Sequence, residues 1–324
     1  MKNDFMWSYL IHLSCHEWDD PMSPPRGAYL KGVTFNENNN TDIDVWDEVI
    51  RNLGAFQFNS VIIDLGDAVQ YESHPEICAP DAWSKDFLKQ KLAEIRALGI
   101  EPIPKMNFSA CHDYWLKDYH RMVSTPIYYQ VCADLIKEVC ELFDYPKYFH
   151  IGFDEEVYKY QRYCDIAIVR NTPLWVHDLH FFVDECAKHG ARTLSWGGMG
   201  TVHREAFEKE ITRDLVICTG FYGRYLNPSE VSKLEEDPGQ YYGPNMYLLY
   251  DKLGFDQIPC GSTWNYKWNQ LQMMAFGKDQ LNQDRLKGFM TAPWLMTHPR
   301  ERYGLLKDAE KFYFARKDIY PETL

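Results

Sequence analysis

The chain has 324 residues, of which 45% are hydrophobic and 15% aromatic, which is enough to bury a large core and excludes intrinsic disorder. Its 47 acidic and 34 basic residues give a formal net charge of -13, so its field should repel nucleic acid and anionic membrane surfaces. We therefore expect neutral ligands, with no nucleic-acid or membrane partner.

The N-terminal stretch MKNDFMWSYLIHLSCHEWDD does not read as a signal peptide, because His12, His16 and Glu17 end its apolar run too early. No segment resembles a transmembrane span. Nine cysteines without a CxxC pair argue against a disulfide framework or a structural zinc and favour a reducing compartment. We expect a cytoplasmic protein, or a secreted or periplasmic one whose signal peptide has been removed.

Strand and helix patterns alternate along the whole chain. The segment 81–99 has apolar residues at helical spacing, with Asp81 as its expected N-cap, and short apolar runs precede and follow it. The next helix has Thr125 as N-cap and Pro126 at its first position. In chain order, the predicted strands are 5–14, 60–71, 100–108, 147–153, 191–198, 214–223, 257–264 and 288–295. The predicted helices lie near 42–53, 81–99, 124–143, 173–189, 203–211, 228–253, 269–287 and from 299 onward.

Eight strand-helix units without a linker predict one (β/α)8 barrel over residues 1–324. The alternative is an open doubly wound sheet, but no GxGxxG or Walker loop follows any predicted strand. In a barrel the active site lies at the carboxyl ends of the strands. The predicted strand ends carry His16, Glu17, Trp18, Asp64, Asp67, Asn107, His112, Asp154, Glu155, Trp196, Tyr222, Trp264, Trp268 and Trp294.

The stretch KYFHIGFDEEVY places three acids, Asp154, Glu155 and Glu156, directly after an apolar strand. If a turn aims two adjacent carboxylates inward, their pKa values should diverge, leaving one acid protonated and one ionised, as glycoside cleavage requires. The alternative is structural: Asp154 caps the following helix, and the two glutamates are solvated acids of its first turn.

The sequence HIGFDEE resembles the His-Ile-Gly-Gly-Asp-Glu signature of glycoside hydrolase family 20, the β-N-acetylhexosaminidases. GIEPIPKMNFSACH is similar to that family's third strand and VIIDLGD to its second, so the resemblance covers about residues 58–156. It implies a retaining mechanism without a cofactor, in which the 2-acetamido oxygen of the sugar attacks the anomeric carbon. Asp154 would then polarise the acetamide, and Glu155 would act as general acid and base. His112 and Asp64 match the family's dyad that supports this glutamate, although a lone histidine is otherwise more often structural.

The chain departs from the family pattern at several positions. Phe153 replaces the second glycine of the signature, Lys105 replaces an acid and Asn107 stands near an aspartate position. The first strand lacks the family's sugar-gripping arginine and has SCHEWDD instead, and Met296 stands where the family has a glutamate. Both of these last changes affect hydroxyl recognition, so N-acetylglucosamine, N-acetylgalactosamine, another 2-acetamido sugar and a modified one all stay open.

Other residues are candidates for substrate binding. Glu17 could take over hydroxyl binding, as could His16 or Asp19. A pyranose stacks its apolar face on aromatic rings, so we expect a wall of Trp196, Trp264 and Trp294, with Tyr222 as a hydrogen-bond donor to the acetamide. For each of these aromatics the alternative is simple core or rim packing, and we expect loop packing for Trp268.

Two other functions remain as alternatives. One is a metal-dependent barrel hydrolase or isomerase with His12, His16, Asp64, His112 and Asp154 as ligands, although we predict no metal. The other is a carbohydrate-binding barrel without activity. Linkage, exo or endo action and oligomeric state do not follow from the sequence.

Overall fold

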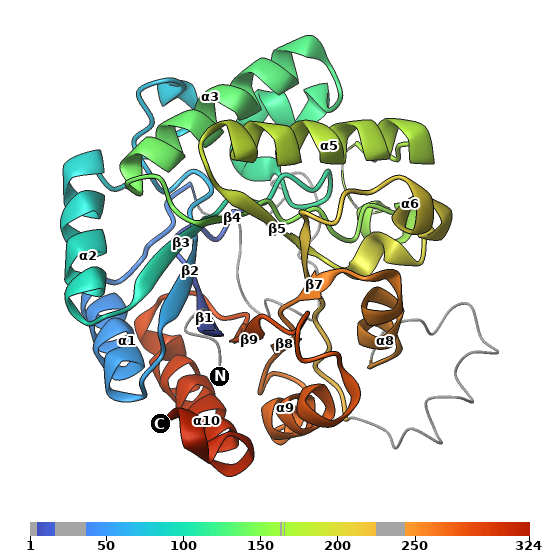
Figure 1. Ribbon diagram of the computed structural model, residues 1–324. Helices are drawn as coiled ribbons and strands as arrows, with labels where there is room; N and C mark the ends of the chain where they lie inside the picture. The colour runs from blue at the N-terminus through green and yellow to red at the C-terminus, as the bar shows by residue number, and fades with distance from the viewer. Residues whose placement is uncertain (1–4, 17–36, 163, 165, 225–243) are drawn as a thin grey trace.

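The structure, a computed structural model, describes residues 5–16, 37–162, 164, 166–224 and 244–324. Its centre is a curled sheet of parallel strands (Figure 1). The strands are β1 (Met6–His12), β2 (Ser60–Asp64), β3 (Glu101–Lys105), β4 (Tyr148–His150), β5 (Arg192–Trp196), β6 (Val216–Cys218), β7 (Asp256–Gln257), β8 (Cys260–Gly261) and β9 (Gly288–Thr291). They pair in the order β7-β6-β5-β4-β3-β2-β1-β9-β8.

The segment that contains β7 and β8 closes the sheet into a barrel. β7 pairs with β6 and β8 pairs with β9. Between them, Ile258 N donates to Ile217 O of β6 at 3.0 Å, and Pro259 O accepts from Met290 N of β9 at 2.9 Å. One strand interrupted at a proline, which lacks an N–H group, therefore bonds to neighbours on both sides. The nine strand segments make eight barrel strands, and the predicted (β/α)8 fold is confirmed.

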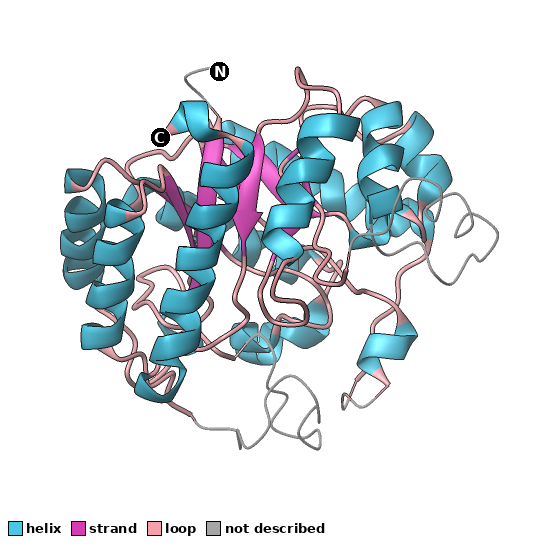
Figure 2. Cartoon of the chain, turned by 90° about the horizontal axis from the view of Figure 1, so that it is seen from below, coloured by secondary structure: helices cyan, strands magenta, loops and turns pink. Residues whose placement is uncertain are grey.

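Helices connect the parallel strands and surround the barrel, as Figure 2 shows from the side. They are α1 (Ile43–Ala55), α2 (Lys85–Ala97), α3 (Pro126–Leu142), α4 (Tyr158–Gln161), α5 (Thr172–Lys188), α6 (Arg204–Lys209), α8 (Pro244–Leu253), α9 (Asn269–Gln280) and α10 (Arg302–Ile319). The predicted N-terminus of α3 is confirmed, because Thr125 Oγ1 accepts from Tyr128 N at 3.3 Å and Pro126 is the first helical residue.

The predicted N-cap of α2 was wrong. The helix begins at Lys85, and the Ser84 side chain accepts from the backbone of its first turn. Asp81 instead accepts backbone N–H groups of Asn39 at 2.9 Å and Asn40 at 2.8 Å, which joins two loops. The acid is thus used in tertiary contacts that a local pattern does not reveal.

Alternation along the strands divides the apolar residues between two cores. Ile11 and Ile63 face the helices, whereas Leu10 and Ile62 face the inside of the barrel. The inner core contains Met6, Leu10, Ile62, Ile103, Tyr148, Leu194, Trp196, Val216, Cys218, Ile258, Cys260, Met290 and Ala292. By the same alternation, the last residues of β1, β2 and β3 point into the barrel beneath its carboxyl end.

No disulfide joins any two of the nine cysteines, all of which are among the described residues. Among the helices that the structure describes, none combines the length and the apolar character needed to cross a bilayer.

Candidate active site

Four polar residues form the floor of the barrel's carboxyl end. Strand register aligns His12 with Asp64, Asp64 with Lys105 and Lys105 with His150. All four side chains are buried. Asp64 Oδ2 forms an ion pair with Lys105 and lies 3.1 Å from His12 Nδ1. Burial lowers the pKa of His12 and lowers that of His150 well below its ordinary value, so both imidazoles are neutral at pH 7.

The contacts of Asp64 differ from those expected from the sequence. Asp64 was predicted to support His112, but the structure pairs Asp64 with Lys105 and His12. The reason is the strand register, which places these three side chains next to one another at the ends of adjacent strands. His112 Nδ1 is buried and has no hydrogen-bond partner within the described ranges.

A turn of unusual backbone conformation follows β4. Gly152, Phe153 and Glu155 have φ values of 71°, 69° and 57°, in the left-handed region. At Gly152 a Cβ atom would lie 1.9 Å from Oδ1 of Asn107, so only glycine fits there. Non-glycine residues in this region are strained and occur most often at functional sites. Because the chain turns here, the side chains of Asp154 and Glu155 do not alternate between opposite faces as they would in a continuing strand.

Asp154 is held by Ser109. The Asp154 N–H group donates to Ser109 Oγ at 2.7 Å, and this hydroxyl lies 2.9 Å from Asp154 Oδ1 and 2.6 Å from Asn107 Oδ1. Burial raises the pKa of Asp154, and the neighbouring charge of Glu155 raises it further. His112 and Lys105 act in the opposite direction and favour the Asp154 carboxylate.

Glu155 points toward His112. His112 Nε2 lies 3.3 Å from Glu155 Oε2, and about a third of the Glu155 side chain is exposed. The structure thus brings together Asp154, Glu155 and His112, three of the four predicted catalytic residues.

The ligand atoms of these three residues lie within 4.8 Å of one another, and this is the one His, Cys, Asp and Glu group in the described residues that could hold a metal. The five metal ligands considered from the sequence do not form one group: His12 contacts Asp64, His112 and Asp154 lie with Glu155, and His16 contacts Asp67.

The third acid, Glu156, lies apart from this site. Its side chain is buried, forms an ion pair with Arg170, and accepts Ala110 N at 2.7 Å and Trp175 Nε1 at 2.5 Å. Arg170 also pairs with Asp178 of α5. Glu156 therefore anchors the loop after β4 to the helical layer, and because it is buried it is not the solvated first-turn acid of the structural alternative.

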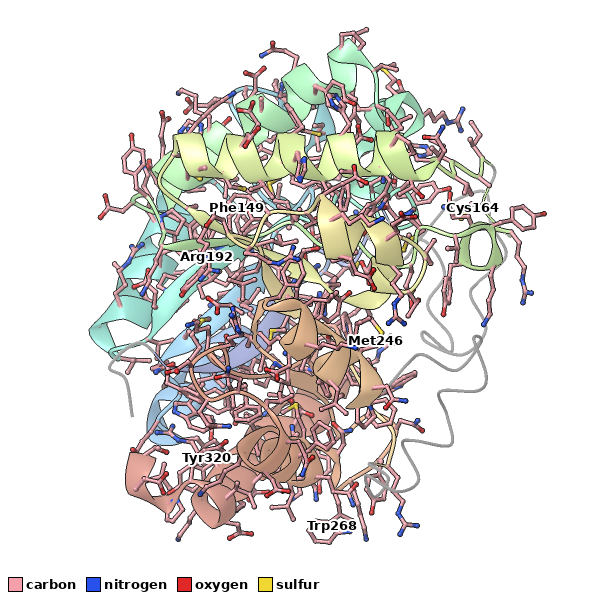
Figure 3. The ribbon with its side chains drawn as sticks, turned by 45° about the vertical axis from the view of Figure 1, so that its right-hand side comes forward. Phe149, Cys164, Arg192, Met246, Trp268 and Tyr320 are labelled. Carbon is pink, nitrogen blue, oxygen red and sulfur yellow. The ribbon has the colours of Figure 1, made fainter. Side chains whose placement is uncertain are left out.

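The four predicted aromatic residues come together. The ring centroids of Trp196 and Trp294 are 5.6 Å apart, those of Trp294 and Tyr222 are 5.9 Å apart, and those of Tyr222 and Trp264 are 6.2 Å apart. Trp196 is buried in the barrel, whereas 42% of Trp264 is exposed, so this aromatic wall runs from the interior to the surface. Trp268 is separate: it lies at the periphery (Figure 3), with Lys267 and Lys311 against its ring.

Glu17 and Asp19, considered for hydroxyl binding, and the strand-end residue Trp18 lie outside the described residues. Met296, which stands where the family has a glutamate, forms an isolated parallel β-bridge with His12 of β1. Sequence reasoning missed Ser109 as the partner of Asp154, and it missed the contact of His16 with Asp67. Serine spacing carries no signal for the first contact, and the second depends on two loops that are far apart in the chain.

No family model and no curated protein matches this sequence. Solved structures do match. A chitobiase from Flavobacterium johnsoniae is 14% identical, with a TM-score of 0.63 over 97% of this chain and 52% of its own. An inactive mutant of the exo-β-N-acetylglucosaminidase from Vibrio harveyi is 14% identical, with a TM-score of 0.60 over 98% and 57%. The N-acetyl-β-hexosaminidase of Streptomyces plicatus is 12% identical, with a TM-score of 0.62 over 95% and 63%.

The chain spans between about half and less than two thirds of the length of these three proteins. At such low identity the likeness establishes a shared fold. The chain has the barrel architecture found in these hexosaminidases.

Proposed function

We propose that this protein is a retaining glycoside hydrolase that removes β-linked 2-acetamido sugars by substrate-assisted catalysis. The observation that carries the proposal is the arrangement of Asp154, Glu155 and His112 at the carboxyl ends of β3 and β4. The aromatic wall and the names of the structurally similar proteins support the same substrate class.

Asp154 orients and polarises the acetamide of the substrate. When the acetamide oxygen attacks the anomeric carbon, positive charge develops on the acetamide, and the aspartate stabilises it. The contact with Ser109 fixes the carboxylate before the substrate binds, so no reorganisation is needed at that step. The enzyme then needs no nucleophile of its own.

Glu155 protonates the leaving oxygen and then removes a proton from the attacking water. Its partial exposure leaves one edge open toward a leaving group. His112 Nε2 faces the other edge and positions the carboxyl group. Inversion at the anomeric carbon occurs twice, so the product keeps the β configuration.

The aromatic wall receives the sugar. Trp196 and Trp294 offer apolar surface to the pyranose ring and the acetamide methyl group, and Tyr222 offers a hydroxyl donor to the acetamide. Trp264, at the exposed end of the wall, contacts the sugar near the surface.

The proposal is tested with aryl β-glycosides of N-acetylglucosamine, N-acetylgalactosamine, glucose and galactose, assayed with the wild type and Glu155→Gln. We expect turnover of acetamido sugars only, and a loss of about 10²-fold or more in the variant when the leaving group needs protonation. Assays with added chelator should give the same rates. Turnover of plain glucosides would contradict the mechanism, and sugar binding without any turnover would favour a carbohydrate-binding barrel.

A further inference from the structure

A second polar group lies at the carboxyl ends of the first three strands. Its centre is Asp67, whose side chain is fully buried. Asp67 Oδ2 accepts from His16 Nδ1 at 2.6 Å and Lys117 Nζ at 2.7 Å, and Oδ1 accepts from Ser14 Oγ at 2.9 Å and Asn39 Nδ2 at 3.3 Å. We call these five residues the Asp67 cluster. Although burial opposes ionisation, His16 and Lys117 hold the pKa of Asp67 below its ordinary value, so this residue is an anion.

Lys117 reaches the cluster from a strained backbone. Its φ and ψ angles are 53° and -128°, a strained region that non-glycine residues rarely occupy. The strain interrupts a 3-10 segment, Tyr114–Met122, in the loop after β3. The surroundings must hold the backbone in this conformation, and the bond to the buried Asp67 positions the ammonium group.

The ammonium group of Lys117 keeps hydrogen-bonding capacity. An ammonium has three donors, and within the described part of the chain Lys117 donates to Asp67 alone. The lysine side chain is 38% exposed, whereas Asp67 is not exposed at all. Solvent or a ligand can therefore reach the lysine while the aspartate stays covered.

Short contacts connect this cluster to the proposed catalytic pair. At Gly66 a Cβ would lie 2.5 Å from Ser14 Oγ and 3.5 Å from the Trp115 side chain, so these residues are packed together. Trp115 Nε1 donates to Asn107 O at 2.8 Å. The Asn107 side chain then contacts Ser109, which holds Asp154. The Asp67 cluster and the catalytic pair thus belong to one end of the barrel.

We propose that Lys117, held in place by Asp67, binds a hydroxyl group of the 2-acetamido sugar and contributes to the choice of sugar. This inference rests on the proposed substrate class. A hydroxyl oxygen is the appropriate acceptor, because Asp67 already offsets the lysine charge and leaves little attraction for an anionic sugar. In this role the Asp67–Lys117 ion pair takes the place of the arginine that is missing from the first strand, and the Asp67 cluster that holds it draws on the loops after β1, β2 and β3.

The test is calorimetric binding of methyl β-glycosides of N-acetylglucosamine and N-acetylgalactosamine and of their 3-, 4- and 6-deoxy analogues. The variants are Lys117→Met and Lys117→Arg. A matched control is Lys85→Met, because Lys85 also forms a partly exposed ion pair, with Glu138 at 3.0 Å, but on α2. A hydrogen bond to a charged group corresponds to about a ten- to hundredfold change in affinity.

For the wild type we expect one deoxy analogue to bind about ten- to a hundredfold more weakly than its parent sugar. Lys117→Met should bind the parent sugar more weakly than the wild type does, by the same factor that removal of the hydroxyl group costs the wild type. The variant should bind the parent and that deoxy analogue with equal affinity. Lys117→Arg should recover part of the affinity, and Lys85→Met should behave as the wild type does.

The inference is overturned if Lys117→Met weakens the binding of the parent sugar and of every deoxy analogue by the same factor. It is also overturned if the affinity of Lys117→Met for the parent equals that of the wild type, or if the wild type binds neither parent sugar. Binding does not require turnover, so the result is separable from the test of catalysis. If the wild type binds these sugars but hydrolyses none, the proposed function fails and the role of Lys117 is still decided by the affinities.

Discussion

His112 contacts Glu155 through Nε2 at 3.3 Å, while its Nδ1 atom has no hydrogen-bond partner among the described residues. A histidine that supports an acid usually has its second nitrogen fixed by another group. Here no described group binds Nδ1, and Asp64 pairs with Lys105 instead.

We therefore expect His112→Phe to lower kcat by about tenfold to a hundredfold, because Glu155 loses its partner but remains in place. KM should change much less. Steady-state kinetics with an aryl acetamido glycoside measure both. A drop in kcat equal to that of Glu155→Gln would contradict a purely positioning role.

Gly152 and Gly99 allow a matched comparison of strain and steric conflict. Both have positive φ values, of 71° and 75°, but a Cβ at Gly152 would overlap Asn107 and a Cβ at Gly99 would meet nothing within 4 Å. We expect Gly99→Ala to cost roughly 1–2 kcal/mol in free energy of unfolding and to leave activity intact. Gly152→Ala should cost clearly more and abolish activity, because the turn that carries Asp154 must move. Urea unfolding and an activity assay test both variants. Equal losses in free energy of unfolding for Gly99→Ala and Gly152→Ala would contradict the steric overlap with Asn107.

Asp113 should make stability depend on pH. Its side chain is buried, neither carboxyl oxygen has a hydrogen-bond partner in the described ranges, and burial together with Glu156 raises its pKa well above the ordinary value. A raised pKa in the folded state means that stability is complete below the unfolded pKa of about 3.9 and falls as pH rises toward the folded pKa.

Asp113→Asn removes this dependence. We expect the variant to gain free energy of unfolding relative to the wild type as pH rises from 5 to 8, by up to about 1.4 kcal/mol per pH unit until the folded pKa is passed. Urea unfolding at several pH values measures the gain. The exposed Asp118→Asn should show no such trend, and a pH-independent difference for Asp113→Asn would refute the prediction.

The Lys105–Asp64 ion pair should be strongly coupled. Lys105→Met leaves a buried carboxylate with one charged partner removed, which typically costs about 3–5 kcal/mol. The double variant Lys105→Met, Asp64→Asn should be more stable than the single one, because no buried charge is left. Lys137→Met, which breaks an exposed pair with Glu141, should change the free energy of unfolding far less. If the changes in free energy of unfolding for Lys105→Met and Asp64→Asn simply add in the double variant, the two side chains are not coupled.

The sequence was sufficient for the barrel because most helices and strands have their own local pattern and the two alternate along the chain. Asp154 and Glu155 were also recognisable, since adjacent acids after an apolar strand form a local motif. The partner of Asp64 was not recognisable. It depends on the register between strands whose paired residues, Asp64 and Lys105, are 41 positions apart in the sequence, and the upstream motif suggested His112 instead.

Lys117 shows a second limit of sequence reasoning. Its role depends on a backbone conformation inside a 3-10 segment, and nothing in the local sequence requires that conformation. The aromatic wall, and the place of Trp268 outside it, were both expected from the sequence, because each of these residues stands at or just beyond a predicted strand end; the structure adds the contacts between the rings.

Participation of the substrate's acetamide is tested most directly by aryl β-glycosides whose N-acetyl group carries zero, one, two or three fluorine atoms. Fluorine withdraws electron density from the carbonyl oxygen, so a rate that depends on attack by this oxygen must fall with each added fluorine. We expect kcat/KM of the wild type to decrease steeply along the series. A rate that is independent of fluorination would contradict acetamide participation and the role assigned to Asp154.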